Sequence, residues 1–209
     1  MFCIDRRTFI AGSAASLFFL TRPGALFAQD TVNVEDLQTP GELGDKVLGQ
    51  ADAPVTVVEY ASMSCPHCGA FHRETFGDFR LKYIDSGKVR FVFREFPLDA
   101  AAFAVAMVAR CAPADKFFDV IGTYFENQTA WMQQVSKHTI YNVAKDFGFT
   151  QQSFDACLSN QALFAGLEGV RNRGSSFGVQ ATPTFFVNGK RLQGALSIED
   201  LEQEIEPLL

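Results

Sequence analysis

A Cys-Pro-His-Cys tetrapeptide, Cys65 to Cys68, lies where a buried-strand pattern gives way to a helical one, and this junction limits what the chain can fold into. Before it, PVTVVEYAS is a β-rich run of consecutive apolar residues, as expected for a strand covered on both faces. After it, aromatic residues recur at helical spacings as far as Tyr83, and Gly87 closes the pattern. KVRFVFREF then alternates as a second strand. Strand, helix and strand form a βαβ unit, so we expect the two strands to be parallel.

The rest of the chain is mainly helical and then returns to β structure. Residues 99–178 form a helical pattern too long for one crossover, which indicates an inserted subdomain. Ser136 and Thr150 are predicted helix caps, and Gly148 a helix end. In the stretch TFFVNGKRLQG, the Asn-Gly pair predicts a hairpin, because a type I′ turn needs two residues with positive φ. Ser197 begins a predicted capping box and a last helix.

The N-terminus has the features of a targeting segment. A pair of arginines, Arg6 and Arg7, precedes an apolar stretch, which predicts a signal peptide over residues 1–28. The arginines resemble those of a twin-arginine signal, although Asp5 and Ala11 depart from that pattern, and an ordinary secretion signal is the alternative. The chain is therefore expected in the periplasm. The polar residues 29–45 are predicted to be a leader into the domain.

Composition and cysteine count narrow the function further. The 209 residues carry a net charge of −6 and no basic run beyond the first residues, which argues against nucleic acid as a partner. Removal of the signal would take Cys3 with it and leave an even number of cysteines. In an exported protein this favours disulfides. Cys111 and Cys157 both lie in the helical stretch, and we expect them to form a structural disulfide; two free buried thiols are the alternative.

The order of the predicted elements, with CxxC between the first strand and the first helix, resembles the thioredoxin fold. The motif CPHC, the long helical insertion, the Thr-Pro before the hairpin and the run-in from Val47 to Ser62 resemble the DsbA family of secreted thiol–disulfide oxidoreductases. The resemblance covers roughly residues 45 to 209. It implies an α/β thioredoxin fold over 46–98 and 179–209, interrupted by a helical subdomain over 99–178. It also implies no bound cofactor, reduced unfolded exported proteins as substrates, and reoxidation by a membrane quinone-linked partner of DsbB type.

The CPHC motif has the residues that thiol–disulfide exchange requires. A cysteine at a helix N-terminus is stabilised as the thiolate by free backbone N–H groups and the helix dipole. We therefore predict Cys65 as the exposed attacking sulfur, with Pro66 in the first turn, and Cys68 as the buried resolving sulfur. His67 is predicted to stabilise the Cys65 thiolate and so make the disulfide more oxidising; a solvated loop residue is the alternative. His72, one turn further, is expected at the surface.

Three further site residues follow from the resemblance. In this fold a cis-proline loop faces the CxxC, and Pro183 lies where that loop is expected, so Thr182 would present its backbone to a substrate peptide near Cys65. An ordinary trans proline is the alternative. Threonine before the proline also occurs in some isomerases of the superfamily. Glu59, on the first strand, is a candidate to carry protons to or from Cys68, and a solvated glutamate at the strand end is the alternative.

Several other functions remain open from the sequence. A zinc module would use Cys65, Cys68 and His72, with Cys111 or Cys157 as a fourth ligand. A peptide-binding chaperone without redox turnover is a second possibility, and a disulfide isomerase or reductase of the same fold is a third. The short segment before the fold leaves no room for a dimerisation domain, which favours a monomer. The sequence thus predicts a monomeric periplasmic dithiol oxidase.

Overall fold

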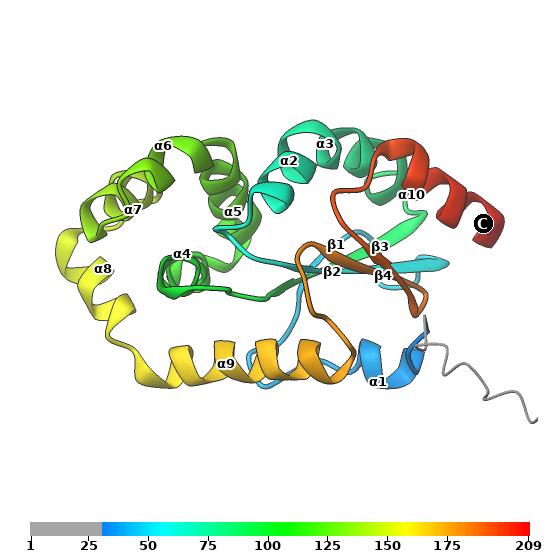
Figure 1. Ribbon diagram of the computed structural model, residues 1–209, viewed down its shortest axis with the longest axis horizontal. Helices are drawn as coiled ribbons and strands as arrows, with labels where there is room; N and C mark the ends of the chain where they lie inside the picture. Colours follow the sequence, from blue (N-terminus) through cyan, green and yellow to red (C-terminus); the bar gives the residue numbers. More distant parts are fainter. Residues whose placement is uncertain (1–30) are drawn as a thin grey trace, which may run out of the picture.

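A five-stranded sheet runs through the middle of the molecule, in the order β1-β3-β2-β4-β5 (Figure 1). The computed structural model describes residues 31–209, so the predicted signal peptide lies outside the described residues. The strands are β1 (Lys46–Leu48), β2 (Val55–Ala61), β3 (Val89–Glu95), β4 (Thr184–Val187) and β5 (Lys190–Gln193). β2 and β3 are parallel, which confirms the βαβ prediction, and the other neighbouring pairs are antiparallel. β1 was not predicted, because three residues are too few to show a period.

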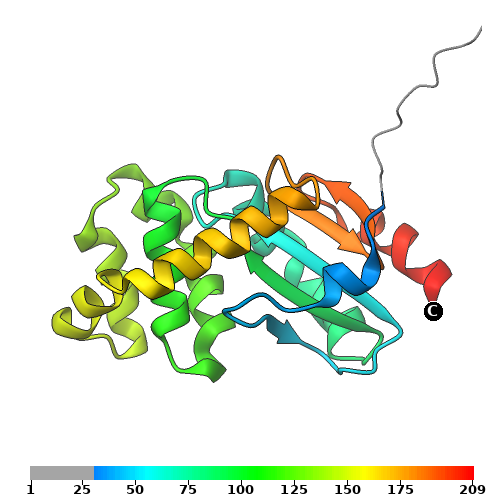
Figure 2. The same ribbon diagram turned by 90° about the horizontal axis from the view of Figure 1, so that it is seen from below.

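Helices cover both faces of the sheet. α2 (Pro66–Glu74), α3 (Phe76–Phe79) and α10 (Ile198–Ile205) lie on one face, and α1 (Val34–Gln38) and α9 (Gln161–Ser176) lie on the other (Figures 1 and 2). Side chains alternate along β2, so Val57 and Ala61 pack into the core under α2, whereas Val58 and Tyr60 pack on the opposite face. The same alternation places Glu59 beneath α2.

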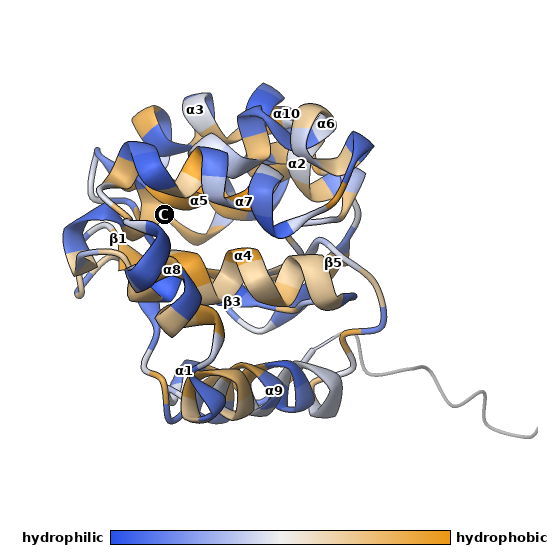
Figure 3. Ribbon diagram, turned by 90° about the vertical axis from the view of Figure 1, so that its left-hand side faces the viewer, coloured by the Kyte–Doolittle hydropathy of each residue, from blue (hydrophilic) through white to orange (hydrophobic). Residues whose placement is uncertain are grey.

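The insertion is a group of helices beside the sheet, and α9 leads from it back along the sheet (Figure 1). Its helices before α9 are α4 (Ala100–Cys111), α5 (Phe117–Glu126), α6 (Gln128–Gln133), α7 (Lys137–Ala144) and α8 (Gln151–Leu158). α4 is largely hydrophobic and lies between the outer helical layers (Figure 3). Ser136 and Thr150 cap α7 and α8 with capping boxes, and Gly148 adopts positive φ, which confirms these three predictions. Among residues 31–209, no helix is both long and apolar enough to span a bilayer.

The helix that follows the cysteines is interrupted, which the sequence pattern did not predict. α2 ends at Thr75, α3 continues to Phe79, and a π-helical turn occupies Arg80–Ile84. The five-residue step from Phe71 to Phe76 exceeds one helical turn, and the break lets both rings pack together with centroids 6.2 Å apart. The π-turn then keeps Tyr83 buried. Where the spacing between apolar residues is longer than one α-helical turn, the helix therefore breaks or widens so that these residues still face the core.

The predicted leader packs closely against the rest of the fold. Leu37 of α1 is buried in the core on the α9 face of the sheet. The guanidinium of Arg94 contacts the Asp45 carboxylate at 2.8 Å and also donates to the Leu37 carbonyl. Arg110 donates to the carbonyl of Leu43. A five-residue helix carries too short a pattern to detect from sequence, and buried arginines from distant elements hold the segment in place.

The C-terminal predictions are confirmed. β4 and β5 form a hairpin in which Asn188 has φ 44° and Gly189 has φ 88°, as a type I′ turn requires. The Ser197 side chain accepts a hydrogen bond from the Asp200 N–H in a capping box that opens α10. β4 pairs with β2, so the loop that precedes β4 is brought to the same end of the sheet as the CPHC motif.

Candidate active site

Cys65 is the N-cap residue of α2, with Pro66 directly after it in the first turn. Its pKa is lowered from the ordinary value of 9.0 to about 5. The largest cause is a hydrogen bond from the Cys68 thiol, and backbone N–H groups of Cys68 and His67 add to it, while burial opposes the shift. The hydrogen bonds together outweigh the effect of burial, and each of them favours the charged form of the Cys65 sulfur. Cys65 is therefore mostly a thiolate at neutral pH.

Cys68 has the opposite electrostatic environment. Its side chain is fully buried, and both cysteines are free thiols in this structure. Burial raises the pKa of Cys68 well above 9.0, with further contributions from its hydrogen bond to Cys65 and from the charge of Glu59. One sulfur of the pair is thus a ready thiolate and the other a stable thiol. This division is what an attacking and a resolving cysteine need.

The prediction of an exposed Cys65 is wrong for the dithiol form, because the Thr182–Pro183 loop lies over it. Cys65 is only 7% exposed, and its Sγ lies 3.1 Å from the Thr182 carbonyl oxygen, which accepts a hydrogen bond from this sulfur when it is protonated. The Thr182–Pro183 peptide bond is cis. The Thr182 side chain is buried beside Cys65, and its interaction with the sulfur is a further cause of the lowered pKa of Cys65. Residues 117 positions apart thus meet at one sulfur.

Glu59 is completely buried, so it is not a solvated glutamate at a strand end. Its carboxylate contacts His72 Nε2 at 3.0 and 3.2 Å. The expectation of a surface His72 is wrong, because the side chain is 3% exposed and stacks on Phe125 with ring centroids 4.3 Å apart. A buried charge needs a partner, and the helix turn that follows CPHC supplies one. No sequence pattern links a strand glutamate to a histidine 13 residues later.

His67 is exposed, and it contributes to the Cys65 environment through its backbone N–H. Among residues 31–209, no hydrogen bond from the His67 side chain to Cys65 is found, so the predicted side-chain contact is absent from the dithiol form. The described residues also contain no cluster of three or more His, Cys, Asp or Glu side chains suited to a metal ion. Because His72 is turned to Glu59, the ligand set of a zinc module does not assemble around the CPHC cysteines.

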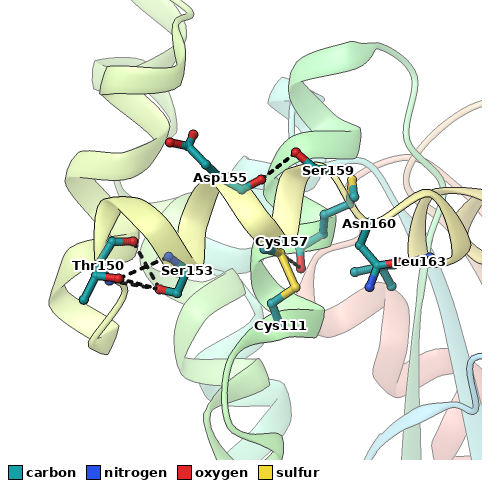
Figure 4. Close-up of a disulfide and its surroundings, with 9 residues drawn as sticks. Cys111, Thr150, Ser153, Asp155, Cys157, Ser159, Asn160 and Leu163 are labelled. Atoms are coloured by element: carbon teal, nitrogen blue, oxygen red, sulfur yellow. Dashed lines mark hydrogen bonds between the residues drawn. A yellow bond between two sulfur atoms is a disulfide. The ribbon is translucent and has the colours of Figure 1, made fainter.

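Cys111 and Cys157 form a disulfide that joins the end of α4 to α8 (Figure 4). The Cα atoms are 6.2 Å apart, and the bond closes a separation of 46 residues. Met107 and Leu167 belong to the small core cluster around Cys157, so the disulfide lies inside the helical insertion rather than at the CPHC motif. It ties the insertion together and leaves the Cys65–Cys68 pair as the free dithiol.

Comparisons with known proteins agree with this geometry. The thioredoxin family model matches residues 42–207. A provisionally named protein-disulfide oxidoreductase of Rickettsia felis is 30% identical over 171 residues, which cover 79% of this chain and 60% of that protein. Disulfide bond formation protein D of Bacillus subtilis is 29% identical over 174 residues, which cover 80% of this chain and 78% of that protein. The chain spans about 60% of the length of the rickettsial relatives it matches.

Solved structures give the same assignment. The crystal structure of Wolbachia pipientis alpha-DsbA1 superposes with a TM-score of 0.77 and 27% identity, and the match covers 84% of this chain and 96% of that one. The match therefore includes the helical insertion as well as the sheet. The family model covers most of the chain, the fold has a DsbA-type insertion, and CPHC lies at the N-terminus of α2. The chain accordingly belongs to the thioredoxin family, as a DsbA-like member.

Proposed function

We propose that this protein is a dithiol oxidase that transfers the Cys65–Cys68 disulfide to other proteins. The observation that carries the proposal is the unequal ionisation of the two sulfurs, with the pKa of Cys65 lowered to about 5 and that of Cys68 raised. A strongly stabilised thiolate makes the reduced form favourable, so the disulfide form accepts electrons readily. The names of the relatives agree with this chemistry.

The reaction begins with the oxidised protein. A substrate thiolate attacks Cys65 Sγ, a substrate–Cys65 bond forms, and the bond to Cys68 breaks. Cys68 leaves as a thiolate and takes up a proton, and the buried Glu59, whose charge acts on Cys68, is the proposed carrier of that proton. A second substrate thiolate then attacks the substrate sulfur of the mixed disulfide. It releases a substrate disulfide and the Cys65 thiolate, so two electrons have passed to the CPHC pair.

The Thr182 backbone is the proposed docking point for the substrate. In the dithiol form its carbonyl accepts from the Cys65 thiol, and an extended substrate segment would replace that contact with strand-like hydrogen bonds. This would hold the substrate sulfur in line with Cys65. Reduced, unfolded exported proteins are the proposed substrates, and the protein would act in the periplasm as a monomer without a bound cofactor. A membrane quinone-linked partner of DsbB type would reoxidise the pair.

The reduction potential of the CPHC pair tests this function. Protein would be equilibrated in glutathione buffers, trapped with a thiol reagent and mapped by peptide mass, so that Cys111 and Cys157 are scored separately. A potential above about −180 mV supports an oxidase, since the strongest oxidants of this fold lie near about −120 mV. A thioredoxin-like value near about −270 mV would rule it out and indicate a reductase or isomerase.

A further inference from the structure

Gln128 is a buried polar residue that reaches the CPHC loop from the helical insertion. It is the first residue of α6, far from the motif in sequence, and is only 5% exposed. Its side-chain Nε2 donates to the Met63 carbonyl at 2.8 Å and to the Cys65 carbonyl at 2.9 Å. The two carbonyls flank Ser64 immediately before the helix. One amide group therefore holds the carbonyls on both sides of the Ser64–Cys65 peptide bond.

The residues around Gln128 hold its side chain in one orientation toward the loop. Two acceptors facing the amide require that its NH₂ end, and not its oxygen, points to the loop. α6 is itself anchored by Trp131, which is 3% exposed and donates to the Tyr124 carbonyl at 2.9 Å. The neighbouring position is Gly69, where a Cβ would lie 2.8 Å from Gln128 Cδ. The glycine directly after Cys68 thus leaves the room that the glutamine side chain occupies.

The hydrogen bonds of Gln128 act on the backbone of Cys65, the residue that carries the thiolate. Cys65 has the extended conformation of an N-cap, with φ −76° and ψ 122°, and its carbonyl also accepts the first helical hydrogen bond from Gly69 N at 3.1 Å. In this conformation the backbone N–H groups of His67 and Cys68 stabilise the Cys65 sulfur. Rotation of the Met63–Ser64 or the Cys65–Pro66 peptide plane, which carry these two carbonyls, would move Sγ away from the donors. Fixing the two carbonyls prevents that rotation.

We propose that Gln128 is a positioning residue through which the helical insertion holds the CPHC loop so that the α2 N-terminus faces Cys65 Sγ. The inference concerns the same site as the proposed function and rests on it for its role in catalysis. It gives the insertion a part in the redox chemistry, besides its place in the fold. It also explains why a polar side chain occupies a buried position between α6 and the loop.

The test compares Gln128→Leu, which removes both donors, with Gln133→Leu, the same change at an exposed position at the other end of α6. The thiolate pKa is read from absorbance at 240 nm in reduced protein, and the reduction potential from glutathione equilibria. We expect Gln128→Leu to raise the pKa of Cys65 by about one unit, a tenfold loss of thiolate stability. The potential should become about 30 mV more negative, and Gln133→Leu should match the wild type.

A purely structural role gives a different result. Loss of packing destabilises the oxidised and reduced forms equally, and the potential depends only on the difference between them. Unchanged pKa and potential, with a lower Tm in both redox states, would overturn the proposal. If Gln128→Leu does not fold, Gln128→Met, which keeps the length without a donor, takes its place in the same comparison. The wild-type potential decides the proposed function, whereas the difference between variant and wild type decides the role of Gln128.

Discussion

The reduced protein should gain stability relative to its oxidised form as the pH rises from 5 to 9. The reason is the pKa of Cys65, which is about 5 in the folded dithiol protein and 9.0 in an unstructured chain. Between these values the folded state has lost the Cys65 proton and the unfolded state still binds it. The free energy of unfolding therefore rises with pH, and this stabilisation is lost as the pH falls through 5. The oxidised form has no thiol at this position and lacks the effect.

The magnitude follows from the width of this window. A full proton difference gives a slope of about 1.4 kcal/mol per pH unit, and since the folded thiol is half ionised at pH 5, the reduced form should gain about 2 kcal/mol between pH 5 and pH 7. Cys65 is 7% exposed, so solvent screening does not remove the effect. Cys68 does not interfere there, because its pKa is raised and its thiol stays protonated in both states below pH 9. Above pH 9 the stability of the reduced form should fall again, because Cys68 then ionises in the unfolded chain and stays protonated in the folded protein.

Guanidinium unfolding of both redox forms at half-unit pH steps measures the difference directly. A Cys111→Ala/Cys157→Ala background leaves the CPHC sulfurs as the redox pair within residues 31–209. Cys65→Ser in the same background is the control, and its stability should lack the slope. A constant difference between the reduced and oxidised forms from pH 5 to pH 8 would refute the reasoning, because it would mean that the folded protein does not ionise Cys65 in this range.

Three further variants test other parts of the structure. Opening the Cys111–Cys157 disulfide with alanine at both positions should lower the free energy of unfolding by about 4 kcal/mol, the loop-entropy value for 46 residues, and a denaturant midpoint unchanged from the wild type would contradict this. Arg94→Met leaves Asp45 buried without its partner and should cost about 3–5 kcal/mol in chemical unfolding; a loss below 1 kcal/mol would show that the ion pair is dispensable. Glu59→Gln removes a charge that raises the pKa of Cys68, so this pKa, measured from the alkylation rate against pH, should fall. Loss of the carboxyl group should nevertheless slow release of the mixed disulfide in stopped-flow assays. An unchanged release rate would argue against Glu59 as a proton carrier.

Much of the architecture could be predicted from the sequence because it depends on neighbours a few residues apart. The apolar run of β2, the cap residues Ser136 and Thr150 and the Asn188 turn are set by backbone preferences that act within one or two turns of chain. The same is true of Cys65 at a helix N-terminus, since a cysteine followed by proline and a helical pattern is a local signal.

Other features depend on contacts between distant segments, and no local pattern records them. The sequence of the leader has the composition of a polar linker, whereas the structure holds it through the buried Leu37 and through hydrogen bonds from Arg94 and Arg110, which lie on a strand and a helix. Glu59 could have been solvated or buried, and its burial against His72 depends on how α2 packs on the sheet. Alternation along a strand gives the face of a side chain but not what covers that face.

The order of elements and the pair of sulfurs that carries the chemistry can be predicted from the amino-acid sequence alone. The ionisation of those sulfurs depends on tertiary contacts. The pKa of Cys65 depends on hydrogen bonds from α2 and on Thr182, and the loop that positions it is held by Gln128 of the insertion. Electrostatic energies depend on distance and burial in three dimensions, so residues far apart in sequence set them. A sequence pattern identifies the reactive group, and its reactivity follows from the fold around it.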